Sequence, residues 1–145
     1  MSGMQPCEIL VVDDNPGDLR LIKESLREGN VPSRIHSARD GEEALAFLRR
    51  QTPFQSAPRP DLILLDLNMP KVGGLEVLKA IKGSSEWKSI PTVILTTSMG
   101  DGDIKGCYEA QANAYLVKPT DLGSFANMLS SIQSFWLTLA TLPVG

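Results

Sequence analysis

Acidic side chains accompany two of the apolar runs in this chain of 145 residues. Asp13 and Asp14 directly follow the run Ile9–Val12, and Asp66 lies in a second run, Leu62–Leu67. Two carboxylates about 4 Å apart repel by about 4 kcal/mol at an effective dielectric constant of about 20, so three gathered together require a cation. Oxygen ligands with access to solvent suit Mg²⁺, which keeps several waters and accepts a phosphate as a further ligand. The three aspartates are therefore candidate metal ligands.

A hydroxyl and an ammonium group add to the chemistry that such a site could perform. Thr96 ends the apolar run Thr92–Thr96, and Lys118 directly follows the run Ala114–Val117. An aspartate can act as a nucleophile and form an acyl phosphate. The metal and Lys118 would then neutralise the phosphoryl oxygens, and Thr96 would donate a hydrogen bond to one of them.

Short apolar runs alternate with helical patterns along the chain, which predicts an α/β fold with a doubly wound parallel sheet. Three runs are apolar on both faces and rich in β-branched residues, as in strands that helices cover on both sides. The five expected strands are Ile9–Val12, Arg34–Ala38, Leu62–Leu67, Thr92–Thr96 and Ala114–Val117. Because ligands bind outside the carboxyl ends of such strands, we expect the polar groups to meet at one rim. The alternation does not fix the strand order.

The helices have recognisable start signals. Asn15 is an expected N-cap with Pro16 at the first helical position, and Asp40 with Glu43 is close to a capping box. The other helices are expected at about residues 74–83, 103–111 and 122–139. The proline-containing stretch Gln51–Pro60 is expected to be a loop that faces solvent.

Composition argues against several classes of protein. The net charge is −3 and no stretch is a basic run, which argues against nucleic-acid binding. No apolar run approaches the roughly 18 residues of a membrane span, and residues 1–7 lack a signal-peptide pattern. A cytoplasmic globular domain is therefore expected. Cys7 and Cys107 are isolated and should be reduced thiols, and His36, with no nucleophile motif to pair with, should lie at the surface.

The acidic and basic motifs together resemble the receiver domain of two-component response regulators. The resemblance is carried by Val11-Val12-Asp13-Asp14, Leu65-Asp66-Leu67-Asn68-Met69-Pro70, Thr96 and Lys118-Pro119. It covers about residues 8–138, between an arm over residues 1–7 and a tail over residues 139–145 with no effector domain. It implies a flavodoxin-like, five-stranded sheet of order 2-1-3-4-5 with helices on both faces.

By the same resemblance, Asp66 accepts a phosphoryl group from a sensor histidine kinase in a reaction that needs Mg²⁺ or Mn²⁺. Asp14, Asp66 and the backbone carbonyl of Asn68 would bind the metal directly, and Asp13 would act largely through water. Thus the protein would catalyse only its own phosphotransfer and dephosphorylation.

The resemblance also assigns the groups around the phosphoryl site. Thr96 and Lys118 would contact the phosphoryl group, the peptide bond after Lys118 is expected to be cis, and Tyr115 occupies the position of an aromatic switch residue. Two residues depart from the family pattern. Thr97 stands where a small residue is usual, which would narrow access to the acceptor, and Thr120 stands where phenylalanine is common.

Two other functions use the same residues. A phosphatase with an aspartate nucleophile needs a second acid two residues later, where this chain has Asn68. A phosphorylation-independent interaction domain is possible on the same fold, but predicts an incomplete acidic pocket. The proline-containing stretch and the ending Phe135-Trp136-Leu137 resemble stand-alone regulators associated with phytochrome-type and related hybrid kinases. Output would then occur by protein contacts, with a histidine phosphotransfer or output protein as a further partner.

The expected last helix is longer than a small sheet requires. Eighteen residues from Leu122 to Leu139 span about 27 Å at about 1.5 Å per residue. We expect Phe135, Trp136 and Leu139 to project beyond the core and to join a two-fold homodimer interface. This interface would include the tail Thr141–Gly145 and lie alongside the fourth helix and the fifth strand. The alternative is that Trp136 packs on its own domain.

Overall fold

Five parallel strands form one sheet in the order β2-β1-β3-β4-β5. The computed structural model describes residues 6–29 and 31–143. The strands are β1 Cys7–Val12, β2 Ser33–Ala38, β3 Leu62–Leu65, β4 Thr92–Thr96 and β5 Ala114–Val117. The fold class and the strand order are as predicted. However, β1 includes Cys7 of the expected arm, and β3 ends before Asp66 because that residue already belongs to the loop at the rim.

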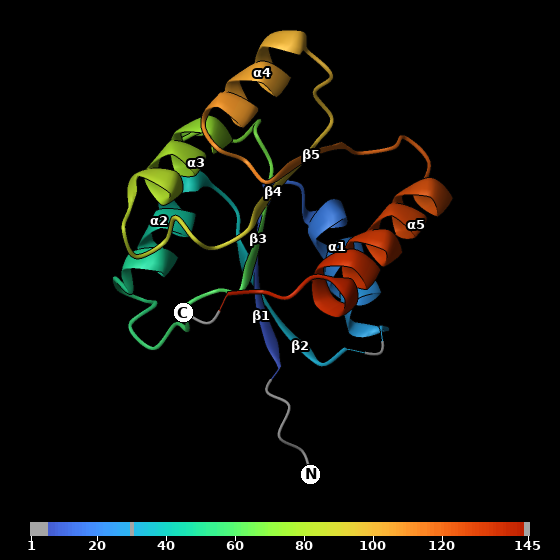
Figure 1. Ribbon diagram of the computed structural model, residues 1–145, viewed down its shortest axis with the longest axis horizontal. Helices are drawn as coiled ribbons and strands as arrows, with labels where there is room; N and C mark the ends of the chain where they lie inside the picture. Colours follow the sequence, from blue (N-terminus) through green and yellow to red (C-terminus); the bar gives the residue numbers. More distant parts are fainter. Residues whose placement is uncertain (1–5, 30, 144–145) are drawn as a thin grey trace.

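Helices cover both faces of this sheet (Figure 1). They are α1 Pro16–Arg27, α2 Gly41–Arg49, α3 Gly74–Gly83, α4 Asp101–Glu109 and α5 Leu122–Ile132, which continues as the π-helical segment η1 Gln133–Leu139. Asn15 and Asp40 cap α1 and α2, since their side chains accept hydrogen bonds from the backbone N–H groups of Asp18 and Glu43. Both caps were expected, whereas α4 begins two residues earlier than its weak pattern indicates.

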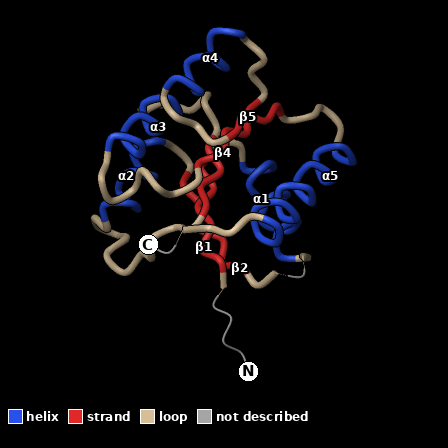
Figure 2. Tube along the Cα trace, viewed as in Figure 1, coloured by secondary structure: helices blue, strands red, loops and turns tan. Residues whose placement is uncertain are grey.

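The central strands separate two apolar layers, because successive side chains of a strand point to opposite faces. Leu10 and Val12 of β1 pack with α2, α3 and α4, while Ile9 and Val11 pack with α1 and α5. Figure 2 shows the two helix groups on either side of the strands. Burial on both sides explains the continuous apolar runs of β1, β3 and β4.

The C-terminal helix differs from the expected regular helix. After Ile132 the backbone becomes π-helical, and Gln133 at that point is buried and donates from Nε2 to the Leu26 carbonyl, 2.9 Å away. Because a π turn contains more residues than an α turn, the side chains that follow point in different directions from those they would have in a regular α-helix. Trp136 is half-buried and packs against the core, so this side chain does not project outward as expected.

Two segments that were predicted to lie at the surface, at His36 and in the loop Gln51–Pro60, are partly buried. His36 is half-buried, with Nε2 2.8 Å from Glu8 Oε1 and its ring 5.2 Å from that of Phe47. Phe54, in the expected solvent-facing loop, packs on Phe47 with ring centroids 5.5 Å apart, and Pro60 is buried. Phe47 of α2 thus covers one face of β2 and binds the loop to it, which the local pattern does not reveal.

Gly74 lets the first turn of α3 lie against the loop that carries Asp66. A Cβ atom there would lie 2.1 Å from the Asp66 carbonyl oxygen, a backbone atom that cannot move independently. Gly74 N also donates to the Leu67 carbonyl at 3.0 Å. The position therefore has no room for a side chain.

We expect Gly74→Ala to lower the free energy of unfolding by about 2–3 kcal/mol through overpacking. Gly83→Ala is the matched control in the same helix, because a Cβ there meets nothing within 4 Å. It should leave stability unchanged or raise it by up to about 1 kcal/mol. Urea unfolding followed by circular dichroism measures both variants. Equal stability of the two variants would contradict the steric account.

Candidate functional site

Four predicted site residues meet at the carboxyl ends of the strands. Asp13, Asp66, Thr96 and Lys118 are all buried there. Backbone bonds continue the sheet pairing past the strand ends: Asp66 N donates to Val12 O at 2.9 Å, and Lys118 N donates to Thr96 O at 2.7 Å. The predicted convergence is therefore confirmed, and the sheet itself fixes where these side chains begin.

A divalent cation fits the acidic part of this rim. Asp13, Asp14 and Asp66 each offer a carboxylate oxygen, and these atoms lie within 4.8 Å of one another. An all-oxygen set with Asp14 exposed suits a hard cation that keeps some of its waters. Asn68 lies beside the cluster, since its backbone N is 3.4 Å from Asp66 Oδ1. These residues could hold a metal ion, whose charge would offset that of the carboxylates.

Lys118, directly after β5, contacts two of these carboxylates and a third one from α1. Its Nζ lies 2.6 Å from Asp13 Oδ2, 2.9 Å from Asp18 Oδ2 and 3.3 Å from Asp66 Oδ2. Asp18, in the first turn of α1, is not among the site residues predicted from the sequence. Its position in the first turn after the Asp13-Asp14 pair is the signal that could have found it, because this turn faces the rim.

Burial and ion pairing act in opposite directions on these groups. Burial raises the pKa of Asp13 more than the hydrogen bonds from Lys118 and from Asn15 N lower it. Burial lowers the pKa of Lys118, but hydrogen bonds to Asp13 and Asp18 and the charges of Asp13 and Asp66 outweigh it and raise the pKa. Lys118 is therefore a firmly held cation at neutral pH.

Thr96 and Tyr115 are joined through the loop that follows β4. Thr96 Oγ1 accepts a hydrogen bond from Ser98 N at 3.4 Å, and the Tyr115 hydroxyl donates to the Ser98 carbonyl at 2.9 Å. Tyr108 of α4 contributes its hydroxyl as acceptor for Tyr115 N at 3.2 Å. A displacement of the Thr96 hydroxyl would therefore reach Tyr115 by way of Ser98.

One backbone expectation at the site is wrong. The bond between Lys118 and Pro119 is not cis, whereas the bond between Thr52 and Pro53 is. Trans is the lower-energy isomer even before proline, and with it the Lys118 ammonium already reaches three carboxylates. Thr97 and Thr120, the two departures from the family pattern, are both exposed.

The fold and the rim define a receiver domain, and comparison with known proteins agrees. The response regulator receiver domain family matches residues 9–130. The chain belongs to this family, whose members work in phosphorylation-based signalling. Among the residues described, no helix is long and apolar enough to cross a bilayer.

The chain is similar to relatives of known structure. It is 44% identical over 140 residues to response regulator Rcp1 of Synechocystis sp., covering 97% of this chain and 95% of Rcp1. The crystal structure of the phosphorylated cyanobacterial phytochrome response regulator RcpA matches with a TM-score of 0.94 and 44% identity, over 97% of this chain and 100% of RcpA. The Mn²⁺-bound form of Rcp1 matches with a TM-score of 0.93 and 44% identity, over 96% of this chain and 100% of that structure.

The carboxylate cluster predicts that a divalent cation stabilises the fold. At a Mg²⁺ concentration about one hundred times the dissociation constant, binding to the folded state adds about 2.7 kcal/mol to the free energy of unfolding. Asp14→Asn should remove most of this gain, because it takes away an exposed ligand that makes no ion pair in the described structure. Urea unfolding in MgCl₂ and in chelator, at matched ionic strength, measures this gain in the free energy of unfolding for both proteins.

The control for this change is Glu109→Gln, an equal loss of charge at an exposed position in α4. It should keep the full response to Mg²⁺. The assignment of the cluster fails if the metal stabilises Asp14→Asn as much as the unchanged protein.

Proposed function

We propose that this receiver domain carries its phosphoryl group on Asp66, received from a sensor histidine kinase in a reaction that requires Mg²⁺ or Mn²⁺. The position of Asp66 carries the proposal. Its carboxylate is one of the three in the candidate cation cluster, and its Oδ2 atom lies 3.3 Å from the Lys118 ammonium. A nucleophilic carboxylate next to a fixed ammonium and a cation site is suited to receive an anionic phosphoryl group. The phosphorylated RcpA and Mn²⁺-bound Rcp1 structures support the same chemistry here.

In the transfer, a carboxylate oxygen of Asp66 bonds to phosphorus while the bond from phosphorus to the donor nitrogen of the kinase histidine breaks. The donor imidazole leaves with the electron pair and takes a proton. Lys118 is close enough to neutralise a phosphoryl oxygen, and the Thr96 hydroxyl, buried at the same rim, donates to another. A bound metal would neutralise the remaining negative charge. Hydrolysis of the acyl phosphate, catalysed by the same residues, would return the protein to rest.

The alternatives are less well supported. A phosphatase needs a proton donor two residues after the nucleophile, and the amide of Asn68 is not an acid. An interaction domain without phosphorylation would not need Asp13, Asp14, Thr96 and Lys118 together around Asp66. A regulator that catalyses only its own phosphotransfer and dephosphorylation fits the rim best.

Phosphorylation is tested with acetyl phosphate on phosphate-affinity gels. Labelling should require Mg²⁺ and should disappear in Asp66→Asn, because the amide is a poor nucleophile and forms no stable acyl phosphate. Asp101→Asn, which alters an exposed acid in α4, should be labelled like the unchanged protein. Labelling of Asp66→Asn, or labelling in excess chelator, would falsify the assignment.

We further infer that Thr96 and Tyr115 transmit the phosphorylated state to the surface of α4 and β5. Both residues bond to Ser98, so a Thr96 hydroxyl drawn to the phosphoryl group would release Ser98 N and disturb the acceptor of Tyr115. The phosphoryl group supplies the free energy for such a shift, because it makes different contacts in the resting and the shifted conformation. Output would go through protein contacts, to a histidine phosphotransfer protein or another output partner.

We propose a cytoplasmic location for these steps, with which the unpaired thiols of Cys7 and Cys107 agree. We propose that the chain consists of an arm, a receiver domain over about residues 8–138 and a tail, with β1 beginning one residue earlier, at Cys7, and η1 ending one residue later, at Leu139. The arm and the tail fall partly outside the described residues.

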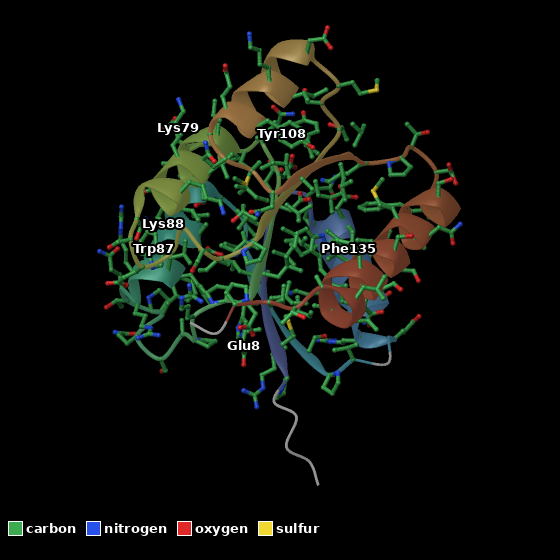
Figure 3. All side chains as sticks on the ribbon, viewed as in Figure 1. Glu8, Lys79, Trp87, Lys88, Tyr108 and Phe135 are labelled. Carbon is green, nitrogen blue, oxygen red and sulfur yellow. The ribbon has the colours of Figure 1, made fainter. Side chains whose placement is uncertain are left out.

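The C-terminal segment supports a homodimer. Phe135 is 51% exposed and Leu139 is 73% exposed, and both lie in the π-helical segment that follows α5. The Phe135 ring, labelled in Figure 3, meets that of Trp136 edge-on, with centroids 5.1 Å apart, so the half-buried Trp136 supports the exposed ring. A large exposed aromatic on a rigid support is typical of a protein interface.

Sedimentation tests the dimer. Phe135→Ala with Leu139→Ala should shift the chain toward a monomer at tens of micromolar, because these changes remove the exposed apolar contacts and leave Trp136 in place. Leu122→Ala is the control, since Leu122 is 74% exposed at the opposite end of α5. A monomeric unchanged protein, phosphorylated or not, would contradict the dimer.

A further inference from the structure

The Lys118 ammonium links the acidic rim to helix α1. Its three carboxylate partners match the three donors of an ammonium group. Two of them, Asp13 and Asp66, belong to the candidate cation cluster, and the third, Asp18, does not. Lys118 therefore has one charged partner, Asp18, that would not serve as a ligand to a metal ion in the cluster.

The ammonium and a divalent cation compete for the same side chains. A cation held by Asp13 and Asp66 would draw their oxygens toward itself and weaken their bonds to Lys118. The Lys118 side chain is only 4% exposed, so water has little access to replace the lost partners. Because a buried charge without a partner is costly, the cation binds tightly only if Lys118 retains another anion.

We propose that Asp18 is a positioning residue that holds the Lys118 ammonium when a divalent cation occupies the oxygens of Asp13 and Asp66. The inference rests on the proposed function of this rim. Asp18 Oδ2 is already 2.9 Å from Lys118 Nζ, and its backbone N–H is fixed by Asn15 Oδ1 at 3.0 Å. In this position Lys118 stays beside Asp66, within reach of a phosphoryl oxygen.

The location of Asp18 suits this role. It comes from the first turn of α1 rather than from a strand end, and its side chain is 27% exposed, against 2% for Asp13. When Lys118 turns to a phosphoryl group, solvent can take its place at Asp18.

Removal of the Asp18 charge should weaken the binding of a divalent cation. Without it, Lys118 retains only Asp13 and Asp66 as charged partners and stays between the two metal ligands. Asp18→Asn should therefore weaken Mn²⁺ binding by about threefold to tenfold, the range of one partly exposed charged hydrogen bond. Asp18→Glu, which keeps the carboxylate on a longer stem, should bind within about twofold of the unchanged protein.

Mn²⁺ binding to the full chain is measured from the electron paramagnetic resonance signal of free Mn²⁺, without any phosphoryl donor. Glu24→Gln is the matched control, because it removes one negative charge from the same helix at an exposed position paired with Arg20. Its affinity for Mn²⁺ should not change. Thermal unfolding without metal checks that each variant is folded.

A double-mutant cycle with Lys118→Met separates positioning from simple charge. In the Lys118→Met background, Asp18→Asn should change the Mn²⁺ affinity by less than about twofold, because the ammonium that Asp18 holds is absent. Equal losses in both backgrounds overturn the proposal, and so does an unchanged affinity of Asp18→Asn alone. If Lys118→Met does not fold, Asp18→Glu decides: a loss equal to that of Asp18→Asn overturns the proposal, and retained affinity supports it. Labelling of Asp66 tests the proposed function separately.

Discussion

Repulsion among like charges at one rim of the sheet governs the site. Asp13, Asp14 and Asp66 place carboxylate oxygens within 4.8 Å of one another, and burial of Asp13 and Asp66 makes their charges more costly. Lys118 offsets part of this charge from inside the protein. The remaining negative charge makes the rim receptive to a divalent cation. With that cation and Lys118 in place, Asp66 can meet an anionic phosphoryl donor.

The scaffold divides into a fixed part and an adjustable part. Asp66 and Lys118 leave the strands with their backbone N–H groups still bonded to neighbouring strands, so their positions follow from the sheet. Ser98 lies in a loop, held through a hydrogen bond to Thr96 at 3.4 Å and another to Tyr115 at 2.9 Å. Chemistry on rigid elements beside a loop that can rearrange is an arrangement suited to a switch.

Local patterns predicted the features that depend on neighbours in the chain. The caps at Asn15 and Asp40 were found because a cap needs only a side chain and the N–H three residues later. The predictions for Trp136 and His36 failed for the opposite reason. Trp136 depends on a π turn that begins beside α1, and His36 depends on Phe47 from α2. Neither partner can be found from spacing along the chain.

The alternation of strands and helices, and the polar residues near the carboxyl ends of the strands, follow from the order of residues alone. These properties follow from hydrophobic periodicity and from the rule that parallel strands present their carboxyl ends together. Which carboxylates hold Lys118 depends instead on packing in three dimensions. Asp18 and Lys118 are 100 residues apart, and their contact depends on how α1 leaves β1 and how β5 joins the sheet. A periodic pattern specifies which face of an element is buried, but not the few ångströms that bring two charged groups into contact.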